Sequence, residues 1–548
     1  MEERTSRPIG QLLKEKGYIR DEHIRFALLE QKATGERLGE ILVRLGLVTE
    51  LEVAQVLAEQ AGLPFDDLEV TVPTPQALLK VPPAFARQHL LLPLRITEGS
   101  LVVAVHDPFN LQLREAVARV SGMRVETVVA PRSRISRALE RFYYFLERPP
   151  EKELEEVTQR LRENPHAEIS MDDLIEKLLL LATSRRATDL HLTPSERTSQ
   201  VFLRIDGILE PFWVFPQAVH PRLIGAIKVR AGMDIAETRL PQDGRMRFSF
   251  LGEEYDLRVS TVRTPVGENM VLRILPVGGT VQHLLHLGFS QEEIALIRDL
   301  LEKPYGMFLV TGPTGSGKTT TLYAGLRLLN LLEKNVLTAE DPIEYRLPLA
   351  RQTQVNEEAG YTFARAIRHF LRQDPDVILV GEVRDEETAE MAVRSALTGH
   401  LFLSTLHTND ALSTLFRLRD LGIGPDLLAS SLLGVLAQRL VRRICPQCRE
   451  EYRPPEELLR YYDLPPDGTY FRGRGCEYCG GKGYVGRTVV AEILRIDEDL
   501  RALIAEGAPQ ARMARAAREG GMRTLREAAR EKVLQGITTV EEVRRVIG

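Results

Sequence analysis

The chain has 548 residues, of which 43% are hydrophobic and 27% are charged, and its formal net charge is −5 at pH 7. This is the composition of an ordinary globular protein, and the length predicts three or four domains. The net acidic charge argues against the basic surface of a general nucleic-acid binder. The first residues, MEERTSRPIG, lack the apolar core of a signal peptide, and no apolar run reaches the roughly 18 to 20 residues of a membrane helix. We therefore expect a cytosolic protein or one bound peripherally to a membrane.

An internal repeat opens the chain, and it predicts a small helical module over residues 1–62. Each copy has the pattern of two short helices separated by glycine, and two copies can bury their apolar faces on each other. The repeated positions, at a constant offset of 29 residues, are Gly10, Gly17, Ile24, Leu28 and Gln31, which recur as Gly39, Gly46, Val53, Leu57 and Gln60. Residues 63–146 then mix helix and strand, with buried strands expected at 101–105 and 124–129.

Residues 147–168 are charged and poorly apolar, which is typical of a linker with some helix. A mixed domain is expected over 169–279. Asp206-Gly207 between two apolar runs predicts one hairpin, and Gly252 between Phe248–Leu251 and Tyr255–Val259 predicts a second. After Pro276-Val277-Gly278-Gly279, residues 280–548 alternate strand and helix, the pattern of an α/β core with a parallel sheet.

The sequence GPTGSGKTT at 312–320 is the strongest chemical signal, because it follows an apolar strand at 307–310 and precedes a helix. In such a P-loop the backbone N–H groups surround the phosphates of ATP at the helix N-terminus. Lys318 supplies positive charge to the β- and γ-phosphates, and the Thr319 hydroxyl is a ligand for Mg²⁺. The expected nucleotide-binding residues are Gly312, Pro313, Thr314, Gly315, Ser316, Gly317, Lys318, Thr319 and Thr320.

Two further predicted strands end in carboxylates. Residues 376–380 are an apolar strand followed by Gly381-Glu382, a position from which a carboxylate can hold the magnesium shell. Residues 336–339 form another strand, followed by Glu340, Asp341 and Glu344. One of these carboxylates is expected to position or deprotonate the attacking water, and the residues by themselves do not rank Glu340 against Glu382.

A third strand, 401–405, lies between His400 and His407 in the stretch TGHLFLSTLHTND. Polar groups at a strand end beside the γ-phosphate can sense whether that phosphate is present. A lone histidine is more often structural, so only the pair in this context suggests a role in the site.

All four cysteines lie in two C-x-x-C pairs, Cys445/Cys448 and Cys476/Cys479, separated by 27 residues. Four thiolates brought together by two such knuckles form a closed, structural zinc site. We therefore expect a zinc-binding insert over 445–479.

In order and spacing, the P-loop, EDPIE, ILVGEVRD and TGHLFLSTLHTN resemble the Walker A, aspartate, Walker B and histidine boxes of the ATPases that power type II secretion and type IV pili. ATDLHL (187–192), RIDG (204–207), PQDGR (241–245) and RVSTVRTPVGENMVLRIL (258–275) are also similar to this family. The resemblance implies a multidomain α/β protein: a RecA-like motor domain, a PAS-like domain before it and a homo-hexamer. It further implies Glu340 as the catalytic carboxylate and Glu382 as the one on the metal side.

The same resemblance implies a machine and partners. Assembly and secretion motors of the family carry the cysteine insert, whereas retraction motors generally lack it, and residues 417–448 look closer to the type II secretion members. A type II secretion motor is therefore expected first and a type IV pilus assembly ATPase second. Its partners would be an inner-membrane platform protein and the cytoplasmic domain of a secretion or pilus membrane protein, with no direct nucleic acid.

Arginines before the motor are expected to complete the active site of a neighbouring subunit, as they do in the family. Arg245 and Arg258 are the first candidates and Arg273 the next, with Arg263 beside them. Within the motor itself, Arg384 is close to Glu382.

The N-terminal repeats resemble a cyclic di-GMP module of relatives. Arg37-Leu38-Gly39 fits the Arg-Leu-Gly start of its motif, whereas Arg7-Pro8-Ile9-Gly10 has one inserted residue. The residues expected to bind are Arg37, Gly39 and Gln60. An arginine can stack on guanine and pair with phosphate. The alternative is a helical docking module for a membrane partner.

Two other functions remain open from sequence. A nucleic-acid translocase also uses a RecA-like core, although the chain lacks an aromatic and basic strand-binding tract. A nucleotide-sensing regulator without useful turnover is the other, and the full set of carboxylates and histidines argues against it.

Overall fold

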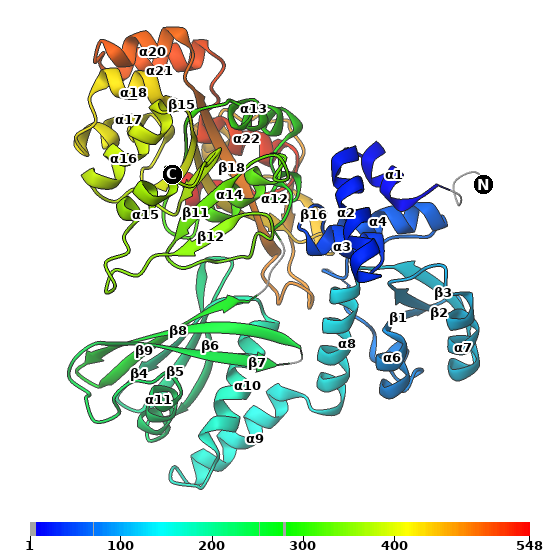
Figure 1. The fold of residues 1–548 in the computed structure, drawn as a ribbon. Helices are drawn as coiled ribbons and strands as arrows, with labels where there is room; N and C mark the ends of the chain where they lie inside the picture. Colours follow the sequence, from blue (N-terminus) through cyan, green and yellow to red (C-terminus); the bar gives the residue numbers. More distant parts are fainter. Residues whose placement is uncertain (1–6, 70, 251, 278–280) are drawn as a thin grey trace. The chain divides into compact units, whose positions relative to one another are not determined.

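A computed structural model describes residues 7–69, 71–250, 252–277 and 281–548 of the chain (Figure 1). The chain divides into two compact units. The first comprises Met1–Ile19 and Glu50–Gly279, and the second comprises Arg20–Thr49 and Thr280–Gly548. Within the described residues, no helix combines the length and the apolar character needed to span a bilayer.

The N-terminal repeat is present as two pairs of helices: α1 (Ile9–Glu15), α2 (Asp21–Thr34), α3 (Leu38–Arg44) and α4 (Glu50–Ala61). Helix α3 repeats the bounds of α1 at the predicted offset, and left-handed Gly17 and Gly46 end these two helices. The repeats exchange partners, because α1 packs on α4 and α2 packs on α3.

The single module expected over 1–62 is therefore divided between the two units, and α2 and α3 belong to the second one. His23 Nε2 lies 3.0 Å from Asn330 Oδ1 in a buried hydrogen bond, and Arg327 donates to the Leu47 carbonyl at 3.3 Å. The α2–α3 hairpin is thus tied to the motor by polar contacts that no local sequence pattern indicates. Residues 1–6 of the expected module lie outside the described residues.

The small α/β domain has a three-stranded sheet of order β1-β2-β3, and the strands expected at 101–105 and 124–129 are confirmed as β2 and β3. Strands β1 and β2 are antiparallel, whereas β2 and β3 are parallel and joined through α7. Its elements are α5 (Pro75–Leu78), α6 (Pro83–His89), β1 (Leu91–Thr97), β2 (Ser100–Val105), α7 (Leu111–Ser121), β3 (Arg124–Val129) and α8 (Arg132–Glu147).

The segment expected to be a linker differs from that expectation. Its charged stretch forms helix α9 (Pro150–Glu163), whose Leu154, Val157 and Leu161 are buried in one core with α10 (Met171–Ser184) and the sheet that follows. Three apolar residues on one helical face were enough to bring an otherwise polar segment into the domain.

The α+β domain predicted before the motor contains a six-stranded antiparallel sheet of order β6-β5-β4-β9-β8-β7. Both expected hairpins are present, at Asp206-Gly207 and at Gly252. Leu251 of the second hairpin and residues 278–280 at the expected domain boundary lie outside the described residues. The elements are β4 (Ala187–Pro194), β5 (Thr198–Ile205), β6 (Ile208–Pro216), α11 (Val219–Arg230), β7 (Gln242–Phe250), β8 (Glu253–Thr264) and β9 (Gly267–Pro276).

The motor has a seven-stranded sheet of order β12-β11-β13-β14-β10-β15-β18, parallel except for the last strand. Its elements are α12 (Leu284–Leu287), α13 (Gln291–Leu301), β10 (Gly306–Thr311), α14 (Lys318–Leu326), β11 (Val336–Glu340), β12 (Arg351–Gln354), α15 (Phe363–Phe370), β13 (Val377–Val380), α16 (Glu386–Leu397), β14 (Leu401–Leu406), α17 (Ala411–Asp420), α18 (Pro425–Ser431), β15 (Leu432–Ile444) and β18 (Tyr484–Arg495).

Helices cover both faces of this sheet (Figure 1). Met307 and Leu309 of β10 enter the core shared with α15–α18, and the alternate residues Phe308 and Val310 enter the core shared with α12–α14. This burial on both faces explains why the central strands have continuous apolar sequences. Because these strands are parallel, their carboxyl ends all lie at one edge of the sheet, where ligands of such sheets bind.

The cysteine pairs lie between β15 and β18 in sequence, and the last two helices of the chain pack on these two strands. Buried Glu492 of β18 accepts hydrogen bonds from the first backbone N–H groups of α17 and α22, at 2.8 and 3.1 Å. The remaining elements are β16 (Arg449–Tyr452), α19 (Glu456–Tyr461), β17 (Tyr470–Gly473), α20 (Glu498–Ala505), α21 (Gln510–Glu519), α22 (Leu525–Leu534) and α23 (Val540–Ile547).

Candidate active site

The predicted P-loop connects β10 to α14, and its shape depends on glycine. Gly312, Gly315 and Gly317 have φ angles of 148°, 77° and 83°, which residues with a Cβ rarely adopt. A Cβ on Gly312 would also lie 2.6 Å from the carbonyl oxygen of Gln438. The loop is thereby held as an open cradle of backbone N–H groups ahead of the helix, the arrangement that binds phosphate.

Lys318, the first residue of α14, points back into this cradle. Its Nζ donates to the carbonyls of Gly312 and Pro313 at 2.9 and 3.2 Å and lies 3.5 Å from Nδ1 of His407. Burial lowers the pKa of the Lys318 ammonium from its ordinary value. The charge is therefore placed where the phosphates of a nucleotide would replace carbonyl oxygens as its partners. Thr319, next on the helix, carries the hydroxyl expected to bind Mg²⁺.

Gln438 was missed from the sequence, and it supports the P-loop from the neighbouring strand β15. Its Nε2 donates to the Ser316 carbonyl at 2.5 Å, and the side chain is fully buried. A glutamine within the apolar run LLGVLAQRLV is the signal that could have indicated it, because a buried amide needs hydrogen-bond partners.

Glu382 follows β13 at the edge where the P-loop lies. Its carboxylate pairs with Arg384 and lies 3.1 Å from Nε2 of His407. His407 thus joins Lys318 on one side to Glu382 on the other, and Arg384 also reaches Asp341 at 4.0 Å. The structure therefore brings together the lysine, Walker B carboxylate and second histidine that the sequence proposed.

Glu340, the last residue of β11, has different surroundings. It is 2% exposed, and its carboxylate accepts hydrogen bonds from Thr338 Oγ1 at 2.5 Å, from Gln352 Nε2 at 3.1 Å and from the Tyr323 hydroxyl. All three donors are neutral. Because burial is not offset by a cation, the pKa of Glu340 is raised to about 7.

His400 does not join this group, which corrects the expectation that the two histidines act as a pair. It precedes β14, whereas His407 follows it, so the two lie seven positions apart along an extended strand, about 23 Å at roughly 3.3 Å per residue. His400 Nδ1 instead lies 3.1 Å from the carbonyl of Ser395 at the end of α16. Within one chain His400 therefore lies at the opposite edge of the sheet from Lys318, His407 and Glu382.

The four cysteines are gathered as the spacing predicts. Their ligand atoms all lie within 4.8 Å of one another, and Sγ atoms of Cys445/Cys476, Cys448/Cys479 and Cys476/Cys479 are 3.8, 3.8 and 3.7 Å apart. A tetrahedral zinc ion with bonds of about 2.3 Å would place its sulfur ligands about 3.8 Å apart. The residues therefore fit a structural zinc ion, and three of the four are buried.

The comparison with known proteins identifies the family. Residues 165–545 match the family described as Type II/IV secretion system protein. The chain belongs to the type II/IV secretion system protein family. Its members are ATP-hydrolysing motors, so this secretion ATPase is an enzyme that binds nucleotide with Mg²⁺. Residues 61–149 match a second family, the MshEN domain.

Relatives of the secretion ATPase come from two kinds of machine. It is 40% identical to "Type IV pilus assembly ATPase PilB" of Thermus thermophilus over 94% of this chain, although it spans only 59% of that protein's length. It is 49% identical to "Type II secretion system protein E" of Pseudomonas aeruginosa over 68% of this chain and 74% of the relative. The solved structure of the Legionella pneumophila ATPase DotB, 23% identical, shares the fold with a TM-score of 0.52 over 68% of this chain and 94% of its own.

The arginines proposed from sequence form a row in the six-stranded sheet of the secretion ATPase. Arg245 lies opposite Arg258, and Arg258 lies opposite Arg273. Their neighbours in sequence, such as Leu257 and Val259, are buried in the core on the other face. Asp189 Oδ1 on the next strand lies 3.1 Å from Arg273 Nε, so a carboxylate adjoins this end of the row. Arg263 lies outside the row, opposite Glu268.

The N-terminal residues proposed for cyclic di-GMP lie on separate helices. Arg37 precedes α3 and is exposed, Gly39 is in the first turn of α3, and Gln60 near the end of α4 donates to the Arg7 carbonyl at 2.9 Å. The MshEN match begins at residue 61, so it covers the α/β domain and leaves most of the repeat module outside.

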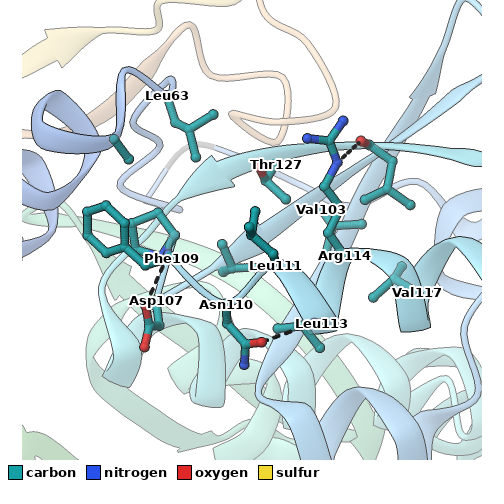
Figure 2. A pocket seen from close by; sticks show the side chains of 14 residues that line it. Leu63, Val103, Asp107, Phe109, Asn110, Leu111, Leu113, Arg114, Val117 and Thr127 are labelled. Atoms are coloured by element: carbon teal, nitrogen blue, oxygen red, sulfur yellow. Dashed lines mark hydrogen bonds between the residues drawn. The ribbon is translucent and has the colours of Figure 1, made fainter. Parts of the chain in front are cut away.

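The α/β domain contains a pocket of about 310 Å³ between its sheet and α7 (Figure 2). Its apolar lining includes valines of β2 and β3 and two leucines of α7, together with Leu63 and Phe109. The polar side chains around it already bond to backbone: Asp107 accepts from Phe109 N, Asn110 accepts from Leu113 N, and Arg114 Nε donates to the Val125 carbonyl. The pocket therefore suits an apolar group better than a phosphate, and Arg37, Gly39 and Gln60 are not among its lining residues.

Proposed function

We propose that this secretion ATPase is the hexameric motor of a type II secretion system, which uses ATP hydrolysis to drive assembly of pseudopilus subunits at the inner membrane. The observation that supports the proposal is the linked set of Lys318, His407 and Glu382 at the P-loop edge, in a chain that is 49% identical to a type II secretion protein over 375 residues. The second candidate function is a type IV pilus assembly ATPase, favoured by the relative that matches 94% of the chain.

We assign roles to the carboxylates as follows. Thr319 and Glu382 hold the Mg²⁺ of Mg-ATP, since Glu382 is the partly exposed carboxylate at the P-loop edge. Glu340 is the base that takes a proton from the attacking water, because a pKa of about 7 suits a general base at neutral pH. His407 links the lysine to the metal-side carboxylate and can respond to the γ-phosphate between them.

The arginine row is the proposed contribution of a neighbouring subunit. A P-loop lysine and Mg²⁺ leave charge on the γ-phosphoryl group that an added arginine can stabilise, with rate gains of about 10³ to 10⁵. Arg245 and Arg258 are assigned this role first and Arg273 second. A homo-hexamer supplies such an arrangement at each interface.

The remaining proposals concern attachment and regulation. The ATPase is held at the inner membrane through a platform protein and the cytoplasmic domain of a membrane partner, and it contacts no nucleic acid directly. The N-terminal repeats bind cyclic di-GMP through Arg37, Gly39 and Gln60, or else they dock the membrane partner. The four cysteines hold Zn²⁺.

Deletion of the gene, with secretion and piliation scored in the same strain, tests the choice of machine. Loss of secretion with normal pili supports the type II assignment. Loss of pili with normal secretion would establish the second candidate in its place. ATP hydrolysis by the purified chain that is stimulated strongly by DNA would instead favour a nucleic-acid translocase.

A further inference from the structure

The buried carboxylate of Glu340 is joined directly to the helix that binds phosphate. Tyr323 lies on α14, five residues after Lys318, and its side chain is fully buried. The Tyr323 hydroxyl donates a hydrogen bond to Glu340 Oε2. Thr338, which lies on the same strand as Glu340, donates from Oγ1 to Glu340 Oε1 at a distance of 2.5 Å. Each oxygen of the Glu340 carboxylate therefore accepts a hydrogen bond from one hydroxyl. The donor to Oε2 belongs to the helix that follows the P-loop, and the donor to Oε1 belongs to β11.

We infer that Tyr323 and Thr338 are positioning residues for the general base, which aim the Glu340 carboxylate and favour its ionised form. This inference rests on the proposed role of Glu340. A hydroxyl that donates to a carboxylate stabilises the charged state, and the effect is large where water is excluded. Without these donors the buried glutamate would hold its proton more tightly and would be free to turn away from the attacking water.

The other groups around Glu340 support this reading. Gln352, on β12, donates a hydrogen bond from Nε2 to Glu340 Oε1 at 3.1 Å. Glu344, in the segment after β11, faces the carboxylate and raises its pKa further. The ring of Tyr345 packs edge-on against Tyr323 with centroids 5.9 Å apart. Burial and Glu344 both raise the pKa of Glu340, and the hydrogen bond from Gln352 lowers it; the two hydroxyl donors are expected to act in the same direction as Gln352.

The test is the pH dependence of ATP hydrolysis by the full chain with saturating Mg-ATP, from about pH 6 to about pH 9.5. Tyr323→Phe should lower kcat about fivefold near pH 7 and move the acidic limb of the profile upward by about one pH unit, because a lost hydrogen bond to a charged group shifts its pKa by about that much. KM and the affinity for nucleotide should stay within about twofold, since the hydroxyl that is removed donates to Glu340 and not to the P-loop. The matched control is Tyr345→Phe, which removes a hydroxyl from the adjoining ring and should keep the wild-type limb.

Thr338→Val, nearly equal in volume, tests the same inference independently and serves alone if Tyr323→Phe does not fold. It should shift the acidic limb in the same direction. The inference would be overturned if either folded variant kept the acidic limb of the kcat–pH profile at the wild-type pH. It would also be overturned if the loss of kcat were matched by a loss of nucleotide affinity. Glu340→Gln separates this failure from a failure of the proposed function. Turnover in Glu340→Gln would show that Glu340 is not the base. An inactive Glu340→Gln, together with a Tyr323→Phe variant whose acidic limb is not shifted, would reject the positioning role alone.

Discussion

Arg245 lies directly opposite Arg258 where β7 pairs with β8, and both project from the face away from the domain core. Like charges in this position destabilise a sheet. The Nε of Arg258 is also buried without a hydrogen-bond partner among the described residues. Such a row is costly for a free surface and well suited to an anion, which supports its proposed contact with phosphate.

If the arginines act on the nucleotide of a neighbour, chains with different defects should complement each other. Lys318→Ala and Arg258→Ala proteins should each be inactive, and their mixture should regain a measurable part of wild-type hydrolysis, because some interfaces then pair an intact P-loop with an intact arginine. Activity per chain should also rise with protein concentration. Arg247→Ala is the matched control, since Arg247 lies on the same strand but opposite Asp256, and it should stay active alone. Turnover that is independent of concentration, with no recovery in mixtures, would mean that each chain works alone.

The two carboxylates should fail in different ways. Glu340→Gln should lower kcat by about 10² or more, the range for loss of a general base, while nucleotide still binds. Glu382→Gln should also cut turnover strongly but raise the Mg²⁺ concentration needed for half-maximal rate, because it removes the charge proposed to hold the Mg²⁺ ion. Steady-state hydrolysis over a Mg²⁺ titration distinguishes them, with Lys318→Ala as the inactive reference. Wild-type turnover in Glu382→Gln would end its assigned role.

Protein purified without chelator should contain one zinc ion per chain, measured by elemental analysis. Its removal, or Cys448→Ser, should expose residues 453–469 to protease long before the motor core is cut, because a structural site supplies local folding energy. Nucleotide binding should persist. Protein free of zinc that resists protease equally would show that the fold of the insert does not depend on metal.

Cyclic di-GMP, titrated calorimetrically into the full chain, should bind, and Arg37→Ala should weaken binding at least about tenfold through loss of a charged hydrogen bond. Arg20→Ala offers a control at another exposed arginine that precedes a helix of the same hairpin. Absence of heat at high micromolar ligand would leave the docking role for these repeats.

The sequence was informative where chemistry depends on local spacing. The P-loop glycines, the cysteine pairs and the Asp206-Gly207 turn each predict a local geometry, and each is present. It was uninformative where the partner is distant. Tyr323 meets Glu340 only because α14 packs beside β11, and nothing near residue 323 predicts that contact. His400 and His407 look like a pair in sequence, yet the length of one strand places them at opposite edges of the sheet.

The motor is discontinuous along the chain, and this affects the order in which it can form. His23 and Asn330, which share a buried hydrogen bond, are 307 positions apart, so at about 5 to 20 residues per second roughly 15 to 60 s of synthesis separate them. During that interval the α2–α3 hairpin has left the ribosome before its docking site exists. On a polysome, a chain further along already presents that site. Exchange of this hairpin between neighbouring nascent chains is therefore a route to interlocked molecules before any ring is assembled.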